Sequence, residues 1–111
     1  MMDFAAGFPS ITPREFSERR ARGVQMTLVD VREPQELAIA SVAGAVHVPL
    51  SELPRRAEEL RGQSLVLMCH HGMRSARACA WLVRSGFEDV TNLSGGIDQW
   101  STDVDSSVPR Y

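Results

Sequence analysis

The chain has 111 residues, of which 43% are hydrophobic, and its formal net charge is −2 at pH 7. This length predicts a single domain over residues 1–111, with a core of about residues 8–100 and a C-terminal tail at 101–111, that needs no metal or disulfide for stability. The acidic balance argues against a nucleic-acid partner, and no apolar run approaches the roughly 18 residues that a membrane span requires.

The first ten residues do not have the pattern of an export signal. They carry no basic residue ahead of an apolar stretch, and Asp3, Gly7 and Pro9 interrupt them. We therefore expect a cytoplasmic protein. In that compartment two cysteines stay reduced, and a reactive cysteine is more plausible than a disulfide.

The first predicted element is a helix within ITPREFSERRARG. Thr12 is its expected N-cap, Pro13 its first residue and Glu15 the partner of Thr12 in a capping box. Gly23 ends it.

The remaining elements alternate between strands and helices. In chain order they are a strand at 26–31, a short helix entered through Pro34, a strand at 44–50 closed by Pro49, a helix from the cap Ser51 to Gly62, a strand at 64–68, a helix from Ser75 to Ser85 ended by Gly86, a strand at 89–93 and, after Gly95-Gly96, a short helix at 97–100. The strand at 64–68 shows no alternation, which suits burial on both faces of a parallel sheet. The tail from Ser101 to Tyr111 is expected to be irregular.

This alternation predicts an α/β fold, with a mostly parallel central sheet of about five short strands flanked by helices on both faces. In such sheets functional sites form beyond the carboxyl ends of the strands. The turn after Met68 lies at such an end, and it begins with Cys69.

The segment CHHGMRS, from Cys69 to Ser75, joins a predicted strand to a predicted helix. Such a turn directs backbone N–H groups inward, and the helix N-terminus adds partial positive charge. Gly72 allows the positive φ that this cradle needs, and Arg74 adds a full charge. Together they favour the thiolate of Cys69 over the thiol, and the same cradle would hold an anionic group bound to the sulfur.

The surroundings of this loop are locally positive. All twelve basic residues are arginine, and the segment 60–87 holds four of them and no Asp or Glu. Two interpretations stay open: drift in composition, or attraction of an anion and stabilisation of a thiolate.

The second cysteine, Cys79, fits a core position. It lies with Ala76, Ala80 and Val83 on a stripe of helical spacing. A cysteine there is most often a small hydrophobe. Because it is ten positions from Cys69, the two do not form a C-x-x-C redox pair.

Two classes of enzyme place a cysteine in such a cradle. Cysteine phosphatases need five residues between the cysteine and the arginine, so that the loop can hold a tetrahedral phosphate. Only four residues separate Cys69 from Arg74. The shorter loop favours a sulfur atom and its attached group, and the sequence offers no obvious Asp as general acid or base.

On these residues the chain resembles the rhodanese-type sulfurtransferases, whose active-site loop is a Cys, four residues and an Arg. CHHGMRS matches that loop, LVDVREPQELAIASVAGAVHVP resembles the family's DVR…E strand and helix followed by GA…P, and NLSGGIDQW resembles its closing GG…W element. Together the three motifs cover Leu28 to Trp100. The ending VDSSVPRY is similar to that of stand-alone rhodanese domains related to those fused to enzymes that activate small sulfur-carrier proteins.

The resemblance implies a ping-pong sulfur transfer through a persulfide on Cys69. The donor would be a small anion such as thiosulfate, and the acceptor cyanide, a thiol or a sulfur-carrier protein. No metal, cofactor, nucleic acid or membrane partner is implied, since a lone His70-His71 pair is not a metal site. We expect a monomer.

The resemblance also implies roles for individual residues. Cys69 and Arg74 would be catalytic, with Arg74 either binding the sulfonate of thiosulfate or anchoring loop carbonyls. The substrate-binding loop would consist of His70, His71, Gly72, Met73 and Ser75, with the side chains of His70, His71 and Met73 directed outward around the mouth. Asp30, Arg32 and His47 are expected to be structural.

Other functions stay open beside general sulfur transfer. A dedicated sulfur relay to a carrier protein would use the same chemistry with another acceptor. A non-catalytic rhodanese-like binding module commonly lacks the cysteine, whereas Cys69 is present here with Gly72 and Arg74. A cysteine phosphatase or arsenate reductase is disfavoured by the loop length.

Overall fold

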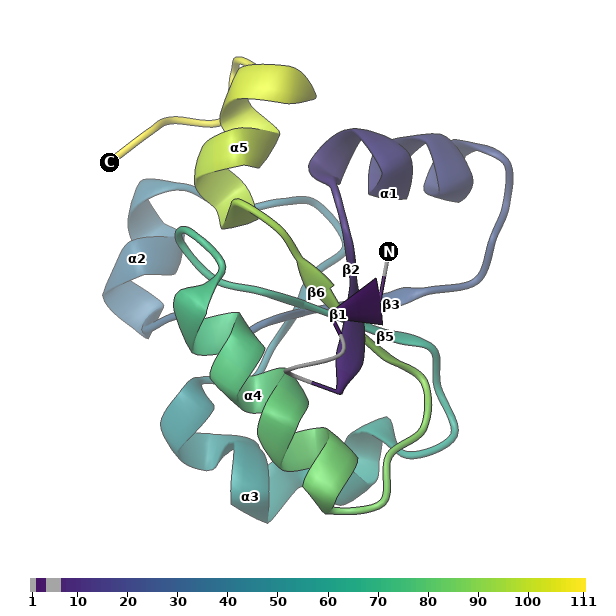
Figure 1. The fold of residues 1–111 in the computed structure, drawn as a ribbon. Coiled ribbons are helices and arrows are strands. Elements are labelled where there is room, and N and C mark those ends of the chain that lie inside the picture. Colours follow the sequence, from purple (N-terminus) through teal and green to yellow (C-terminus); the bar gives the residue numbers. More distant parts are fainter. Residues whose placement is uncertain (1, 4–6) are drawn as a thin grey trace.

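The computed structural model describes residues 2–3 and 7–111, with a six-stranded sheet at the centre of the molecule (Figure 1). The strands are β1 (Met2–Asp3), β2 (Phe8–Ile11), β3 (Thr27–Asp30), β4 (Val46–His47), β5 (Leu65–Met68) and β6 (Val90–Leu93). Their order is β1-β2-β6-β5-β3-β4; β1 runs antiparallel to β2, and the other five strands are parallel. The predicted α/β fold with a mostly parallel sheet is confirmed.

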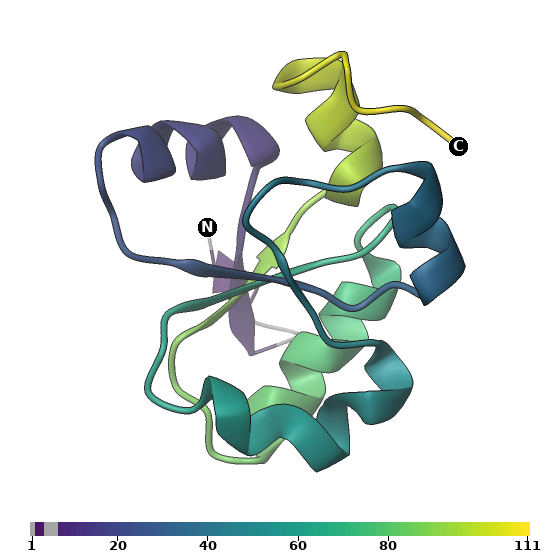
Figure 2. The same ribbon diagram turned by 180° about the vertical axis from the view of Figure 1, so that it is seen from behind.

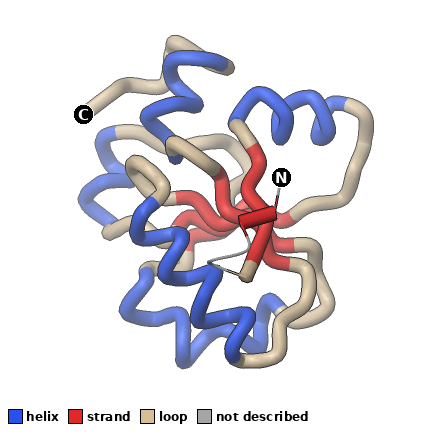
Figure 3. The backbone as a smooth tube through the Cα atoms, viewed as in Figure 1, coloured by secondary structure: helices blue, strands red, loops and turns tan. Residues whose placement is uncertain are grey.

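Helices surround the sheet on both faces (Figure 3). They are α1 (Pro13–Ala21), α2 (Pro34–Ile39), α3 (Leu53–Arg56), α4 (Met73–Arg84) and α5 (Gly96–Asp103), and two 3-10 turns, η1 (Leu50–Glu52) and η2 (Ala57–Leu60), flank α3. α3 and α4 cover one face, and α1 and α5 pack together over the other. Within residues 2–3 and 7–111, no helix is long and apolar enough to cross a membrane.

The central strand β5 separates two apolar cores. Leu65 and Leu67 pack with residues of α3 and α4, whereas Val66 and Met68 pack with residues of α1 and α5. All four are at most 2% exposed. Because side chains alternate between the faces of a strand, this burial requires helices on both sides, which confirms the prediction for this strand.

The start of α1 is built as predicted. The Thr12 side chain accepts a hydrogen bond from the Glu15 N–H (3.1 Å), and the Glu15 carboxylate accepts one from the Thr12 N–H (3.0 Å). This capping box satisfies two amides that have no partner inside the helix.

Two predictions about the segment 51–62 are wrong. Ser51 is not an N-cap but lies inside η1, because the Leu50 N–H donates to the Val31 carbonyl (3.0 Å) and holds the chain at the end of β3. The segment from there to Leu60 forms η1, α3 and η2 instead of one helix. The helix expected from Ser75 begins at Met73, since its preceding glycine already turns the chain.

Described residues near both ends of the chain also form elements that were not predicted. The strand β2 was not predicted. It pairs with β6 only at Ser10 and Ile11, so the missing N–H of Pro9 interrupts no bond between these two strands. α5 extends to Asp103, into the tail predicted to be irregular. Both views of the ribbon place the last residues of the chain beside α2 (Figures 1 and 2).

Candidate functional site

Cys69 lies directly after β5, at the carboxyl end of the parallel sheet, where the chain turns into α4. The residue is 1% exposed. Its sulfur accepts a hydrogen bond from the Gly72 N–H at a distance of 3.1 Å. Gly72 has φ +104°, which an L side chain rarely adopts, and this conformation aims its amide at the sulfur.

The N-terminus of α5 shapes the first residues of the loop. The Ile97 N–H donates to the Cys69 carbonyl (2.9 Å) and the Asp98 N–H to the His70 carbonyl (3.1 Å). Both carbonyls are therefore directed at the first turn of α5. Gly96 makes this approach possible: a Cβ on it would lie 2.4 Å from the Cys69 oxygen.

A buried polar network fixes the far side of the loop. The Ser75 hydroxyl donates to Asn92 Oδ1 (2.6 Å), and Asn92 Nδ2 donates to the Gly72 carbonyl (3.2 Å). The same hydroxyl lies 3.4 Å from the Cys69 sulfur. Asn92 on β6 thus ties α4 to the turn, so that the Gly72 amide stays directed at the thiol.

Arg74 does not project free into solvent. Its guanidinium makes a bidentate pair with the Glu36 carboxylate at 2.7 and 2.8 Å. The Arg74 hydrogen bonds lower the pKa of Glu36 to about 2, and the same carboxylate raises the pKa of Arg74. No role was assigned to Glu36 from the sequence, although it lies in the segment that resembles the DVR…E element of the family.

Replacing Glu36 with glutamine should make stability less dependent on pH. The folded pKa of Glu36 lies below its unfolded value, so the ion pair stabilises the fold above about pH 4.5 and is lost as the pH falls toward 2. Because Arg74 is one-third exposed, solvent screens the pair, and we expect about 1–2 kcal/mol at pH 7. Urea unfolding of the wild type, Glu36→Gln and the control Glu88→Gln should show this difference shrinking toward pH 2 only for Glu36→Gln. A difference independent of pH would contradict it.

The last residue of the chain closes over this network. The Tyr111 hydroxyl donates to the Glu36 carboxylate (2.9 Å) and accepts from Arg32 (2.8 Å). Its ring stacks on His70, with the centroids 3.8 Å apart and an angle of 4° between the planes. The final segment of the predicted irregular tail is therefore part of the site.

Arg32 connects Tyr111 to the end of β3. Its guanidinium is fully buried and pairs with Asp30 at 2.7 Å, and it also donates to the Ala40 carbonyl (2.9 Å). A ring nitrogen of His47 lies 2.7 Å from the Arg32 carbonyl. These contacts fit the structural roles predicted for Asp30, Arg32 and His47, because a buried charge requires a paired and hydrogen-bonded environment.

The outer side chains of the loop differ in exposure. Met73 is 75% exposed, and the His71 side chain is 60% exposed, so both face outward as expected. His70 is instead half-buried between the rings of Tyr111 and His71. Burial of the ring is the main cause that lowers the pKa of His70, and the neighbouring His71 lowers it further.

Cys79 lies in the core formed between β5 and α4, with no exposed surface. Burial raises the pKa of its thiol to about 12, so it stays protonated at neutral pH. The structure thus separates one cysteine whose sulfur accepts a hydrogen bond from the Gly72 amide from one in an apolar core. The cradle suits a sulfur nucleophile and whatever group that sulfur carries.

Comparison with known proteins agrees with this chemistry. The family model described as Rhodanese-like domain matches residues 12–103. A sulfurtransferase of Allochromatium vinosum is 36% identical over 92 residues, which are 82% of this chain and 86% of that protein. Among solved structures, a rhodanese-related protein from Thermoplasma volcanium has a TM-score of 0.79 at 33% identity, with 87% of this chain and 94% of that chain covered.

Some similar proteins are much longer than this chain. The Mycobacterium tuberculosis protein named "Probable adenylyltransferase/sulfurtransferase MoeZ" is 36% identical over 111 residues, which are 96% of this chain but 28% of that protein. YrkF of Bacillus subtilis is 33% identical over 98 residues, or 53% of its length. The chain therefore spans about half the length of YrkF and less than a third of the length of MoeZ.

Proposed function

The chain belongs to the rhodanese-like domain family, and from this we propose that it is a sulfurtransferase that carries a sulfane sulfur on Cys69. The donor is thiosulfate, and the acceptor is a thiophile: cyanide in an assay, and a thiol or a protein in the cell. The observation that carries the proposal is the loop itself, in which the Gly72 amide donates to the Cys69 sulfur at 3.1 Å.

The reaction runs in two displacement steps. The Cys69 thiolate attacks the outer sulfur of thiosulfate; a sulfur–sulfur bond forms to Cys69, and the bond inside thiosulfate breaks, with its electron pair leaving on sulfite. The acceptor then attacks the terminal sulfur of the persulfide, and Cys69 leaves as the thiolate. The Gly72 amide, which donates to the sulfur, stabilises that thiolate at the start and at the end of the cycle.

Arg74 contributes to donor binding through its loop position. Two of its N–H groups are held by Glu36, and a guanidinium carries five in all. We assign the remaining donors, together with the loop amides, to the sulfonate end of thiosulfate. Glu36 fixes the orientation of the guanidinium, which makes it a positioning residue in this proposal.

The test is the mass of the intact protein after incubation with thiosulfate. We expect a gain of one sulfur atom, because the persulfide persists until an acceptor removes it, and we expect added cyanide to reverse the gain. Sulfate, an anion of similar shape without a sulfane sulfur, is the matched control and should leave the mass unchanged. An unchanged mass with thiosulfate would support the non-catalytic module instead.

The same protein sample tests whether the chain is a phosphatase instead of a sulfurtransferase. If the protein hydrolyses an aryl phosphate faster than it transfers sulfur from thiosulfate, the argument from four loop residues is wrong.

A relay to a sulfur-carrier protein is the second candidate. It is supported by the similarity to MoeZ, whose name combines adenylyltransferase and sulfurtransferase. For both candidates we propose that the protein is a monomer. We also propose that it acts in the cytoplasm, where its two free cysteines would stay reduced.

A further inference from the structure

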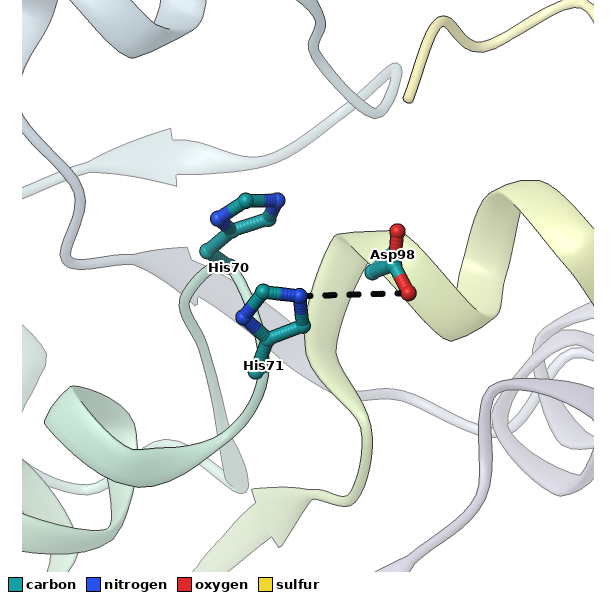
Figure 4. Close-up of side chains that lie close together, drawn as sticks. All are labelled: His70, His71 and Asp98. Atoms are coloured by element: carbon teal, nitrogen blue, oxygen red, sulfur yellow. Dashed lines mark ion pairs between the residues drawn. The ribbon is translucent and has the colours of Figure 1, made fainter. Parts of the chain in front are cut away.

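Three side chains with metal-binding atoms meet beside the thiol loop. His70 and His71 follow Cys69 in the chain, and Asp98 lies in the first turn of α5. One ligand atom of each lies within 4.8 Å of those of the other two. Figure 4 shows the two imidazole rings stacked, each with a ring nitrogen turned toward the Asp98 carboxylate. The sequence showed only the pair of histidines, and the fold supplies the third group.

A second observation at this place points to a missing partner. Nε2 of His70 is buried and has no hydrogen-bond partner among residues 2–3 and 7–111. A buried polar atom left without a partner costs free energy, because its hydrogen bond to water is lost and not replaced. A ligand that bonded this nitrogen would remove that cost.

The spacing suits an ion of small radius. Nε2 of His71 and Oδ2 of Asp98 are 3.9 Å apart. Ligand atoms around a tetrahedral zinc ion, with bonds of about 2.1 Å, lie roughly 3.4 Å from one another. His71 is exposed, so its ring can rotate toward the ion. Because imidazole nitrogen binds a metal in the plane of its ring, this rotation also takes His71 out of its stack on His70. The Cys69 sulfur does not belong to the group of atoms within 4.8 Å.

We propose that His70, His71 and Asp98 bind one divalent transition-metal ion of the zinc class. Two imidazoles and one carboxylate select such ions over magnesium or calcium, which prefer oxygen ligands alone. Water completes the coordination. The ion ties the loop after Cys69 to α5 through side chains, alongside the two backbone hydrogen bonds that already join them.

Arg110 competes with the ion for the carboxylate. Its Nε donates to Asp98 Oδ1 at 2.9 Å, and its Nη2 donates to Oδ2 at 3.2 Å. Oδ2 is also the oxygen that faces His71. The ion therefore displaces one of two hydrogen bonds from Arg110, and removal of this arginine should strengthen metal binding.

Calorimetric titration of zinc into the Cys69→Ser protein tests the site. This background removes the thiol as a ligand and abolishes sulfur transfer, so the result does not depend on the proposed function. We expect one ion per chain, bound at least tenfold more weakly after Asp98→Asn or His71→Ala and more tightly after Arg110→Ala. The exposed carboxylate of Asp89 provides the matched control, and Asp89→Asn should leave the affinity unchanged.

Three results would overturn the site. They are no binding in the Cys69→Ser protein, an affinity after Asp98→Asn equal to that after Asp89→Asn, and an affinity unaffected by His71→Ala. Circular dichroism of each variant establishes that it is folded. The side chains of His71 and Asp98 both reach solvent, so if one of the two variants fails to fold, the other still tests the site.

Discussion

Replacing Cys69 with serine should reduce sulfur transfer from thiosulfate to cyanide to the rate of the uncatalysed reaction. A serine hydroxyl cannot form a persulfide, so no intermediate remains to carry the sulfur. The sulfur of Cys69 is the atom to which the Gly72 amide donates, and the Ser75 hydroxyl lies 3.4 Å from it. The measurement is the rate of thiocyanate formation together with the intact mass after thiosulfate treatment, which should show no gain.

Cys79→Ala is the matched control for this variant. Its thiol is buried with a pKa of about 12, so its removal should leave most of the activity. Loss of a buried sulfur atom should lower the free energy of unfolding by about 1 kcal/mol. Equal loss of activity in two folded variants would contradict the separate roles of the two cysteines.

Replacing Gly96 with alanine should strongly lower the rate of sulfur transfer, although Gly96 is far from Cys69 in the sequence. Gly96 has φ +59°, and a Cβ there would lie 2.4 Å from the Cys69 carbonyl oxygen and 2.5 Å from that of His70. Left-handed backbone costs an L residue about 1–2 kcal/mol by itself. The clash is with backbone atoms, so the loop has to move. A shift of about 1 Å in a reacting group can reduce the rate on the order of a hundredfold.

Gly86→Ala isolates the backbone contribution. Gly86 also has positive φ (+92°), but a Cβ there would meet no atom within 4 Å. We expect this control to lose stability and to keep the activity of its folded fraction. Thermal unfolding and thiocyanate formation measure the two effects. Similar activities for the two folded variants would show that the close approach of α5 does not shape the loop.

The parts of the site that the sequence predicted are those encoded by neighbouring residues. The apolar run of β5, the glycine at position 72 and the loop length all lie within one short segment, and there local conformation follows from residue type. The capping box of α1 is predictable for the same reason, since Thr12 and Glu15 are one turn apart.

The remaining residues of the site come from elsewhere in the chain. Glu36 lies 38 residues from Arg74, and Asn92 lies 17 residues from Ser75. Each looked like an ordinary polar residue of a helix or a strand, and only the strand order of the sheet brings it to the loop. Tyr111 had no periodic pattern around it that would place it against His70.

Tyr111 also gives the protein a spectroscopic label that requires no chemical modification. It is the only tyrosine of the chain, so its ring signals in a proton NMR spectrum belong to one place, the stack on His70 beside Cys69. Burial, the largest influence, raises the pKa of its phenol, which keeps the ring in one protonation state over the neutral range. An ion that binds His70 would alter the stacking of its ring on Tyr111, and with it the ring-current shift of the tyrosine signals. The tyrosine resonances can therefore follow ion binding in the unmodified protein.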